Sequence, residues 1–569
     1  MPSPANLLTD FILRQSYADL PEPIRHQAKR CLLDSMGALS AGAVTPLARL
    51  TARTAERFFR GGECTLISSG RKVSPLGASM ANGFASNALD VEHGYRPAQG
   101  RPGAALTPVM LAAAEMAETP PSGTDMLAAV AVGYEVGMRS GMYWNRDHAR
   151  VYTSGLWGAI GAVAAAGRIL GLKEDVLLQA LNCADYHGPV GFIARGVATP
   201  CMTKDGVGWG AHTAMMSILL AQAGFTSPLL DFDAALAEEL GSRWRMADLY
   251  FKPYCCCRWA QASIAGALKI VRENHLAVSD IRRLVIHTFS KAASLSREHP
   301  THTDAAQYNI TYPIAVALLD GQISGAQVLP PRIFDKDVLE LADMIEVVVE
   351  ERFEERFPAR TFSEVCITTT DGRELRSGEL EPQWEPADSP SDEELLDKFT
   401  RLTAPVFGEQ ECARMREAIS GMRKTWTMRW TSGRAPLPVI SRSNHMDMIQ
   451  STGAPAAIGP YSQAVDTGST VYLSGQIGQD PASGQIVTGF KAQTIQALEN
   501  LKAVLAAAGM TLDNMAQVDV FVTDMRNFED FNAIYSTYFP AYKPARLFVE
   551  VRGLCPGAEV EIRGIACRR

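Results

Sequence analysis

The stretch GLWGAIGAVAAAGRILGL, residues 155–172, decides the fold of the first half of the chain, because it is the most apolar segment present. Alanine and glycine dominate it, and Arg168 interrupts it. Small side chains let neighbouring helices approach closely, whereas a membrane span needs about 20 mostly apolar residues. The stretch therefore predicts a tightly packed helix in a large helical core, not a transmembrane segment.

Helical spacing of apolar residues continues on both sides of this stretch, up to about residue 262. Apolar positions three and four residues apart indicate helices with a buried face. The expected helices cover residues 24–41, 104–118, 125–142, 155–170, 175–183 and 208–223. Residues 1–264 are thus predicted to form an all-α domain.

The pattern changes between residues 265 and 385, where short runs of β-branched residues replace the helical spacing. Such runs, bounded by turn residues, are typical of strands. The expected strands cover residues 284–289, 345–349 and 364–369, the last turning at Asp371-Gly372 into 373–375 as a hairpin. This segment is predicted to be an α+β lid domain.

A helical pattern returns after the lid, and a predicted linker and a second mixed pattern of strands and helices follow it. Ser391 and Glu394 have the spacing of a capping box, so residues 386–430 are expected to return as helices to the first domain. Residues 431–445 are predicted to be a linker. Residues 446–569 are predicted to be a compact α+β domain, with strands at 471–474, 518–522, 546–551 and 559–566 and helices at 490–508 and 528–539. The last two strands are expected to form a pair.

The composition is that of a globular protein with several domains. The 569 residues include 54 Lys and Arg against 62 Asp and Glu, which gives a net charge of −8. A mildly acidic surface repels phosphate backbones and anionic lipids. Neither nucleic acid nor a membrane surface is therefore expected as a partner.

The cysteines and the amino terminus favour a reduced compartment. None of the 11 cysteines forms a C-x-x-C pair, and Cys255, Cys256 and Cys257 are expected to be buried free thiols. The start, MPSPAN, lacks the regions of a signal peptide, so a cytoplasmic location is expected. Neither metal-binding nor nucleotide-binding motifs are found, so no metal and no cofactor is expected.

Two charged residues interrupt the apolar strands near the carboxyl end. Arg546 opens one predicted strand, and Glu561 lies within the last. An arginine can hold a substrate carboxylate with two hydrogen bonds, and a carboxylate can position a water molecule. The alternative is an Arg–Glu ion pair that only joins two strands. Spacing alone leaves both interpretations open.

Residues 446–569 closely resemble the Rid (YjgF) family of enamine/imine deaminases. The resemblance rests on IGPYSQA (458–464), SGQIG (474–478) and the final PAR and VEI segments. It implies a chorismate-mutase-like α+β fold, a homotrimer with clefts between subunits, and hydrolysis of 2-imino or 2-enamino acids. Arg546 matches the family's carboxylate-binding arginine and Glu561 its water-orienting acid. Tyr461 matches the cleft tyrosine, and Asn532 and Gly475 match further pocket positions.

Two positions depart from the pattern of that family. Phe548 stands where a cysteine often follows the arginine motif. Arg563 stands in place of a second acid after Glu561. The first change is expected to alter reactivity little, and the second is expected to change the charge of the cleft.

Residues 5–430 resemble the MmgE/PrpD family. The resemblance rests on CLLDSMGA (31–38), NGFASNALD (82–90), WGAIGA (157–162), MTK (202–204), FKPY (251–254) and LLDG (318–321). The family includes 2-methylcitrate dehydratase, cis-aconitate decarboxylase and iminodisuccinate epimerase. Its chemistry removes a group from a carbon next to a carboxylate, which requires a base and cationic groups where negative charge develops.

Asp90, Lys204 and Tyr312 match the family's active-site acid, lysine and tyrosine. Their alternatives are a helix-end cap, a solvated lysine and a packed tyrosine. His93 is a candidate replacement base, with a structural histidine as the alternative, because Arg101, Tyr152 and Gln261 stand where the family has histidines. Arg101 and Arg258 are expected to bind substrate carboxylates but cannot act as bases near neutral pH.

The leading hypothesis is a bifunctional catabolic enzyme. The first half would be a lyase or isomerase for a small polycarboxylate, and the second would hydrolyse the imine or enamine released. The alternatives are a second half that only trimerises or senses a ligand, and a first half that is an inactive scaffold. If the first half forms a dimer and the second half forms a trimer, as the resemblances imply, closed symmetry predicts a homo-oligomer with six subunits.

Overall fold

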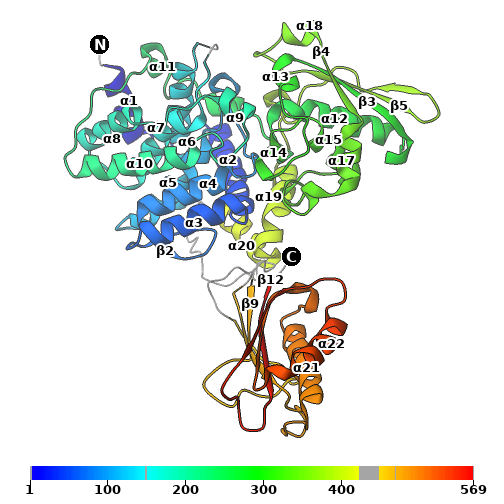
Figure 1. Ribbon diagram of the computed structural model, residues 1–569. Coiled ribbons are helices and arrows are strands. Elements are labelled where there is room, and N and C mark those ends of the chain that lie inside the picture. Colours follow the sequence, from blue (N-terminus) through cyan, green and yellow to red (C-terminus); the bar gives the residue numbers. More distant parts are fainter. Residues whose placement is uncertain (1–2, 148–149, 422–446, 468–469, 568–569) are drawn as a thin grey trace. The chain divides into compact units, whose positions relative to one another are not determined.

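The computed structural model describes residues 3–147, 150–421, 447–467 and 470–567 (Figure 1). The chain divides into a larger unit, residues 1–435, and a smaller unit, residues 436–569. The predicted linker at 431–445 lies outside the described residues.

Helices build the first part of the larger unit, as the spacing of apolar residues predicts. They are α1 (Pro4–Arg14), α2 (Glu22–Gly42), α3 (Pro46–Phe58), α4 (Pro75–Asn87), α5 (Gly103–Met116), α6 (Gly123–Trp144), α7 (Ser154–Ile169), α8 (Glu174–Tyr186), α9 (Ile193–Ala198), α10 (Val207–Gln222) and α11 (Ala234–Glu238). A short antiparallel pair, β1 (Cys64–Thr65) and β2 (Lys72–Val73), lies between α3 and α4. The all-α prediction missed this pair, because two-residue strands carry no recognisable period.

Helix α7, which forms most of the stretch at 155–172, is buried along nearly its whole length. It packs closely on α6, where a Cβ at Gly161 would lie 2.6 Å from the carbonyl oxygen of Gly133. Glycine is therefore required at this crossing, since a longer side chain would push the two helices apart. The predicted packed helix is confirmed.

The lid follows along the chain and contains a four-stranded sheet with the order β4-β3-β5-β6. The strands are β3 (Ile281–Thr288), β4 (Ile345–Val349), β5 (Ser363–Thr369) and β6 (Glu374–Arg376). The helices are α12 (Arg258–Glu273), α13 (Ser290–Ala293), α14 (Thr303–Gln307), α15 (Tyr312–Asp320), α16 (Gly325–Val328), α17 (Lys336–Asp343) and α18 (Glu351–Glu354). The predicted strands and the hairpin at Asp371-Gly372 are confirmed. The expected boundary at 264/265 falls inside α12.

The chain then returns to the first helices through α19 (Asp392–Phe407) and α20 (Glu409–Ser420). Ser391 and Glu394 form the capping box that starts α19. Helix α19 packs against α2, and both contribute to the same apolar core.

The smaller unit is a six-stranded sheet with two helices on one face (Figure 1). The strands are β7 (Asp447–Ile449), β8 (Ala464–Asp466), β9 (Thr470–Ile477), β10 (Met515–Val522), β11 (Ala545–Glu550) and β12 (Val560–Cys567), and the helices are α21 (Phe490–Ala507) and α22 (Phe528–Tyr538). The strand order is β11-β10-β12-β9-β8-β7. The expected pairing of the last two strands is therefore wrong, because β10 lies between them, parallel to β11 and antiparallel to β12.

Two expectations from composition concern the helices and the thiols. Among the described residues, no single helix has the length and apolar composition needed to cross a membrane, although the bent pair α2 and α3 passes that test by length and composition alone. All 11 cysteines are free, and Cys255, Cys256 and Cys257 are buried as predicted. Burial raises the pKa of each of these three thiols, so they are weak nucleophiles.

Candidate functional site

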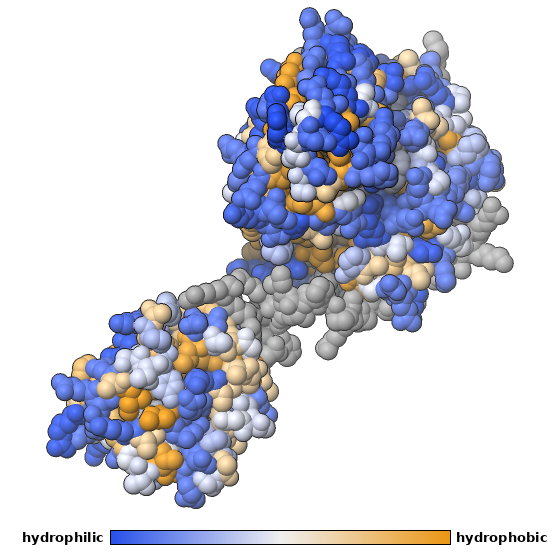
Figure 2. Space-filling model, turned by 90° about the vertical axis from the view of Figure 1, so that its right-hand side faces the viewer, coloured by the Kyte–Doolittle hydropathy of each residue, from blue (hydrophilic) through white to orange (hydrophobic). Residues whose placement is uncertain are grey.

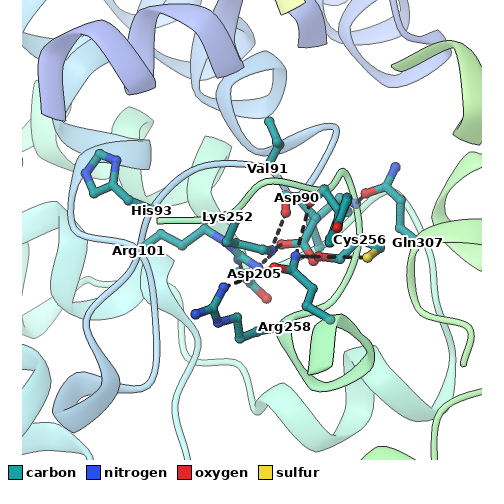
Figure 3. A network of polar contacts seen from close by, with 12 residues as sticks. Asp90, Val91, His93, Arg101, Asp205, Lys252, Cys256, Arg258 and Gln307 are labelled. Carbon is teal, nitrogen blue, oxygen red and sulfur yellow. Dashed lines mark hydrogen bonds and ion pairs between the residues drawn. The ribbon is translucent and has the colours of Figure 1, made fainter. Parts of the chain in front are cut away.

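Two candidate residues of the larger unit, Asp90 and Lys204, adopt left-handed backbone conformations with φ of 52° and 50°. Residues other than glycine rarely do so, and such strain gathers at functional sites. The Arg101 guanidinium forms ion pairs with the carboxylates of Asp90 and Asp205 (Figure 3). The structure therefore brings Asp90 and Arg101, two of the predicted site residues, into direct contact.

Lys252 is a further member of this cluster. Its Nζ lies 3.1 Å from Oδ1 of Asp90 and also donates a hydrogen bond to the Asp90 carbonyl oxygen. Burial, followed by the charge of Arg101, lowers the pKa of Lys252 well below its usual value. A lysine with a lowered pKa can accept a proton from a substrate. The sequence analysis assigned Lys252 no role, although its segment FKPY carries part of the resemblance.

Lys204 lies on the lid side of the same region. Its Nζ is 3.2 Å from Oδ1 of Asp304, donates a hydrogen bond to Gln307, and stands 5.1 Å from the centre of the Tyr308 ring. Burial lowers the pKa of Lys204, and Asp304 opposes that shift. Lys204 is therefore a buried, partnered cation and not a solvated surface lysine.

A cavity of about 110 Å³ lies beside Arg101 and Asp205, and both parts of the larger unit line it. Asp90, Lys204 and Lys252 are buried behind this wall and are not among the residues that line the cavity. Arg258 reaches it from the start of α12, donates to Glu385 at 2.8 Å, and stacks 4.6 Å from the centre of the Tyr250 ring. Arg96 forms an ion pair with the same carboxylate. The side chains along the wall include Arg96, Arg101, Asp205, Tyr250, Arg258, Trp259, Tyr308 and Phe357.

The cations of this site are already paired with carboxylates of the chain. They are Arg96, Arg101, Lys204, Lys252 and Arg258, against Asp90, Asp205, Asp304 and Glu385. A substrate carboxylate that binds here would therefore share these cations with their present partners or replace one of the partners. In the part of the chain that the structure describes, no three His, Cys, Asp or Glu side chains are placed to hold a metal ion.

The structure does not bring His93 and Tyr312 into this cluster. Both ring nitrogens of His93 are engaged, Nδ1 with Asp34 and Nε2 with Tyr134, each at 2.8 Å, and Figure 3 shows the ring apart from the other labelled side chains. The buried Tyr312 hydroxyl donates to the carbonyl oxygen of Gln327 at 2.6 Å. Their surroundings are those of a structural histidine and a packed tyrosine.

A buried polar network holds the segment that follows Asp90. The Asp34 carboxylate accepts hydrogen bonds from the His93 backbone and ring, and Lys398 bonds both Asp34 and the carbonyl oxygen of Val91. Burial raises the pKa of Asp34, but Lys398 and His93 outweigh burial and bring it to about 2. Asp34 on α2 and Lys398 on α19 thus hold the backbone segment that follows Asp90 in place.

Glu92 in the same network predicts a pH-dependent stability. Burial raises its pKa from 4.5 to about 8, against the hydrogen bond from Ser35. Between those pH values Glu92 ionises in the unfolded chain but stays protonated in the folded one. The free energy of unfolding therefore falls by about 3–5 kcal/mol as pH rises. Glu92→Gln is expected to abolish this loss, with equal stability at pH 4.5 and a variant more stable than the wild type at pH 8.

Denaturant unfolding followed by helical circular dichroism measures the effect. The matched control is Glu118→Gln, which removes an exposed carboxylate at the end of the α5 region. A Glu92→Gln variant whose stability runs parallel to the wild type from pH 4.5 to pH 8 would contradict the raised pKa.

In the smaller unit, three predicted residues line one cavity of about 550 Å³: Tyr461, Gly475 and Glu561. A Cβ at position 475 would collide with Oε1 of Glu561. Glycine at 475 therefore leaves the space that the Glu561 carboxylate occupies. Arg546 and Asn532 do not line this cavity.

Arg546 and Glu561 project from opposite faces of the sheet. Arg546 is opposite Val518, whose side chain is in the core beneath the helices, whereas Glu561 is opposite Phe521 on the other face. The exposed Arg546 guanidinium lies 4.9 Å from the centre of the Tyr535 ring on α22. Within one chain the two residues therefore form neither an ion pair between strands nor a single site.

Large apolar side chains are exposed on the smaller unit. Figure 2 shows apolar patches among polar ones on the visible face of this unit. The exposed residues include Met448, Ile458, Tyr461, Tyr472 and Leu547, and Ile458 and Met448 are each 74% exposed. Such surface is typical of a region that meets another protein chain.

Comparison with known families divides the chain as the structure does. The family models described as MmgE/PrpD N-terminal domain, MmgE/PrpD C-terminal domain and Endoribonuclease L-PSP match residues 6–239, 254–424 and 451–568.

Several known proteins are similar to the last fifth of this chain. A "2-iminobutanoate/2-iminopropanoate deaminase" of Mus musculus is 48% identical over 120 residues, which are 21% of this chain and 89% of that protein. A "RutC family protein" of Aquifex aeolicus is 42% identical over 22% of this chain and 100% of its own length. The crystal structure of E. coli TdcF with bound serine is 39% identical over 22% of this chain and 99% of that one, with a TM-score of 0.21.

Proposed function

The chain belongs to the MmgE/PrpD family up to residue 424 and to the Rid family from residue 451, and from this we propose a bifunctional cytoplasmic enzyme. The larger unit is a lyase or isomerase that acts next to a carboxylate of a small polycarboxylate. The smaller unit hydrolyses 2-imino or 2-enamino acids to 2-oxo acids and ammonia. Neither reaction is assigned a metal or an organic cofactor.

The observation that carries the proposal is the buried contact among Asp90, Arg101 and Lys252. A lysine with a lowered pKa is suited to take the proton from the carbon next to a substrate carboxylate. Arg101 and Lys204, cations paired with Asp90 and Asp304, are proposed to stabilise the negative charge that develops on that carboxylate. Arg258, held by Glu385, is proposed to bind a second carboxylate.

In the smaller unit, Glu561 is proposed to orient the attacking water and Tyr461 to face the same substrate. Arg546 is proposed to bind the substrate carboxylate, and Asn532 to lie near it. Because Arg546 and Glu561 project from opposite faces of one sheet, a complete site requires two copies of the chain. This arrangement supports a homo-oligomer whose clefts lie between smaller units.

An elimination in the larger unit explains why the two activities would share one chain. Loss of a proton and a neighbouring leaving group from an amino polycarboxylate gives an enamine, which the smaller unit hydrolyses. Tethering raises the local concentration of this short-lived product. The alternatives are a smaller unit that only trimerises or senses a ligand, and a larger unit that is an inactive scaffold.

The purified full-length protein tests both activities separately. We expect it to accelerate the decay of 2-iminopropanoate generated by an amino acid oxidase, and to exchange the α-proton of a di- or tricarboxylate into deuterated water. No acceleration would support the non-catalytic alternative for the smaller unit. Absence of exchange with every polycarboxylate would support the scaffold alternative for the larger one.

Gly475→Ala is expected to lower imine hydrolysis by about 10²-fold, because the added Cβ displaces the Glu561 carboxylate and misplacement of a catalytic group by about 1 Å has this effect. Gly553→Ala is the matched control, since a Cβ there meets no atom within 4 Å. Imine decay measures both variants. Equal activity of Gly475→Ala and the wild type would show that the position of the carboxylate does not matter.

A further inference from the structure

The cavity of the smaller unit carries one cation that the proposed hydrolysis does not use. Its charged lining side chains, among the described residues, are Glu561 and Arg563. They are two residues apart on β12 and therefore project from the same face of the sheet, with their Cα atoms about 7 Å apart. Any substrate carbon that water attacks beside Glu561 thus lies within reach of a guanidinium.

Among the described residues, Arg563 is held in place through the Nε edge of its guanidinium. Its Nε donates to Oδ2 of Asp519 at 3.1 Å, and its guanidinium lies 5.7 Å from the centre of the Phe521 ring. The other Asp519 oxygen accepts from Gln517 at 2.9 Å, which fixes the carboxylate itself. Asp519 is buried, with an exposed fraction of 4%. The arginine is therefore anchored by a buried carboxylate that is itself held by a hydrogen bond.

The outer edge of the same guanidinium remains available to a ligand. Within the described part of the smaller unit, neither Nη atom of Arg563 has a hydrogen-bond acceptor, and the side chain is 57% exposed. Arginine carries five N–H donors, and its two Nη groups match the two oxygens of a carboxylate. A second carboxylate on the substrate is the group that fits this edge.

We infer that Arg563 selects 2-imino acids that carry a second carboxylate, so that the smaller unit hydrolyses imino dicarboxylates in preference to 2-iminopropanoate. The inference rests on the proposed function. Without Arg563, the lining charge would be that of Glu561 alone, which repels a dianionic substrate. A polycarboxylate-specific elimination in the larger unit would release this class of product.

The reaction at the imine carbon is the same for both substrate classes. The oxygen of water forms a bond to C2, and both protons of that water are transferred to nitrogen. The C2–N bond breaks, nitrogen leaves as ammonia, and C2 becomes a ketone. The second carboxylate remains unchanged. Arg563 therefore acts on binding, and its loss should appear in KM more than in kcat.

The test compares two imines on the full-length protein. D-aspartate oxidase acting on D-aspartate supplies iminosuccinate, and D-amino acid oxidase acting on D-alanine supplies 2-iminopropanoate, with semicarbazide trapping to follow each decay. We expect a higher kcat/KM for iminosuccinate in the wild type. Arg563→Gln is expected to lower the ratio of the two values about tenfold or more, through KM, because a charge-assisted bidentate contact is lost. Arg563→Glu should reverse the preference.

Arg526→Gln is the matched control, because it removes the same charge from an exposed side chain outside the cavity. It should leave the ratio unchanged. An Arg563→Gln ratio equal to that of the wild type, with both imines hydrolysed, would overturn the inference and keep the proposed function. Hydrolysis of neither imine above the rate of Glu561→Gln would overturn the proposed function, and the inference with it.

Discussion

Replacing Glu561 by glutamine is expected to slow hydrolysis of a 2-imino acid by about 10²–10⁴-fold, the range for loss of one general acid–base group. Glutamine has the size of glutamate and fits the space beside Gly475, so the sheet should fold unchanged. It cannot accept a proton from the attacking water. Steady-state imine decay measures the loss, and α-proton exchange by the larger unit should keep its wild-type rate.

Two comparisons isolate the role of this carboxylate. Glu529→Gln removes an exposed carboxylate on α22 and should leave imine decay unchanged. Arg546→Ala should be as slow as Glu561→Gln, yet co-expression of the two variants should restore activity. Random assembly of a trimer with each site between two copies predicts about a quarter of the wild-type rate. No restoration would mean that Arg546 and Glu561 do not share a site across copies.

The sequence predicted most helices and strands because each is specified locally. The spacing of apolar residues in 155–172 and the capping box at Ser391 and Glu394 depend only on neighbours along the chain. The order of strands in the smaller unit is not local. After β10 the chain crosses through α22 and adds β11 beside it in parallel, and β12 then pairs with the other edge of β10. No local pattern reports which edge a returning strand will use.

In the candidate site, too, contacts between distant segments could not be predicted from local sequence patterns. Motif segments led to Asp90, Arg101 and Lys204, which lie in the site region, and Asp90 and Arg101 pair with each other. Further partners come from distant segments, since Arg101 also pairs with Asp205 and Lys204 pairs with Asp304. Asp304 and Glu385 lie in the lid, far along the chain and outside the motifs. The engagement of both His93 nitrogens also depends on α2 and α6, through Asp34 and Tyr134. Pairing between charges of remote segments is fixed by packing.

Replacing Lys252 by methionine is expected to lower α-proton exchange in the larger unit by about 10²–10⁴-fold, because it removes the proposed base. Methionine fills the buried space, and Asp90 retains the ion pair with Arg101. Burial lowers the pKa of Lys252 well below that of a free lysine. The wild-type exchange rate should therefore rise with pH as Lys252 loses its proton, and level off below the range in which exposed lysines titrate.

Two further variants separate a base from a simple cation. Lys252→Arg keeps a positive charge beside Asp90 but cannot accept a proton near neutral pH, so it should be as slow as Lys252→Met. Lys291→Met removes an exposed lysine of the lid and should exchange at the wild-type rate. Wild-type exchange by Lys252→Arg would contradict the assignment, since Lys252 would then act only through its charge. The base would in that case be Asp90, whose carboxylate is the proton acceptor next to that charge.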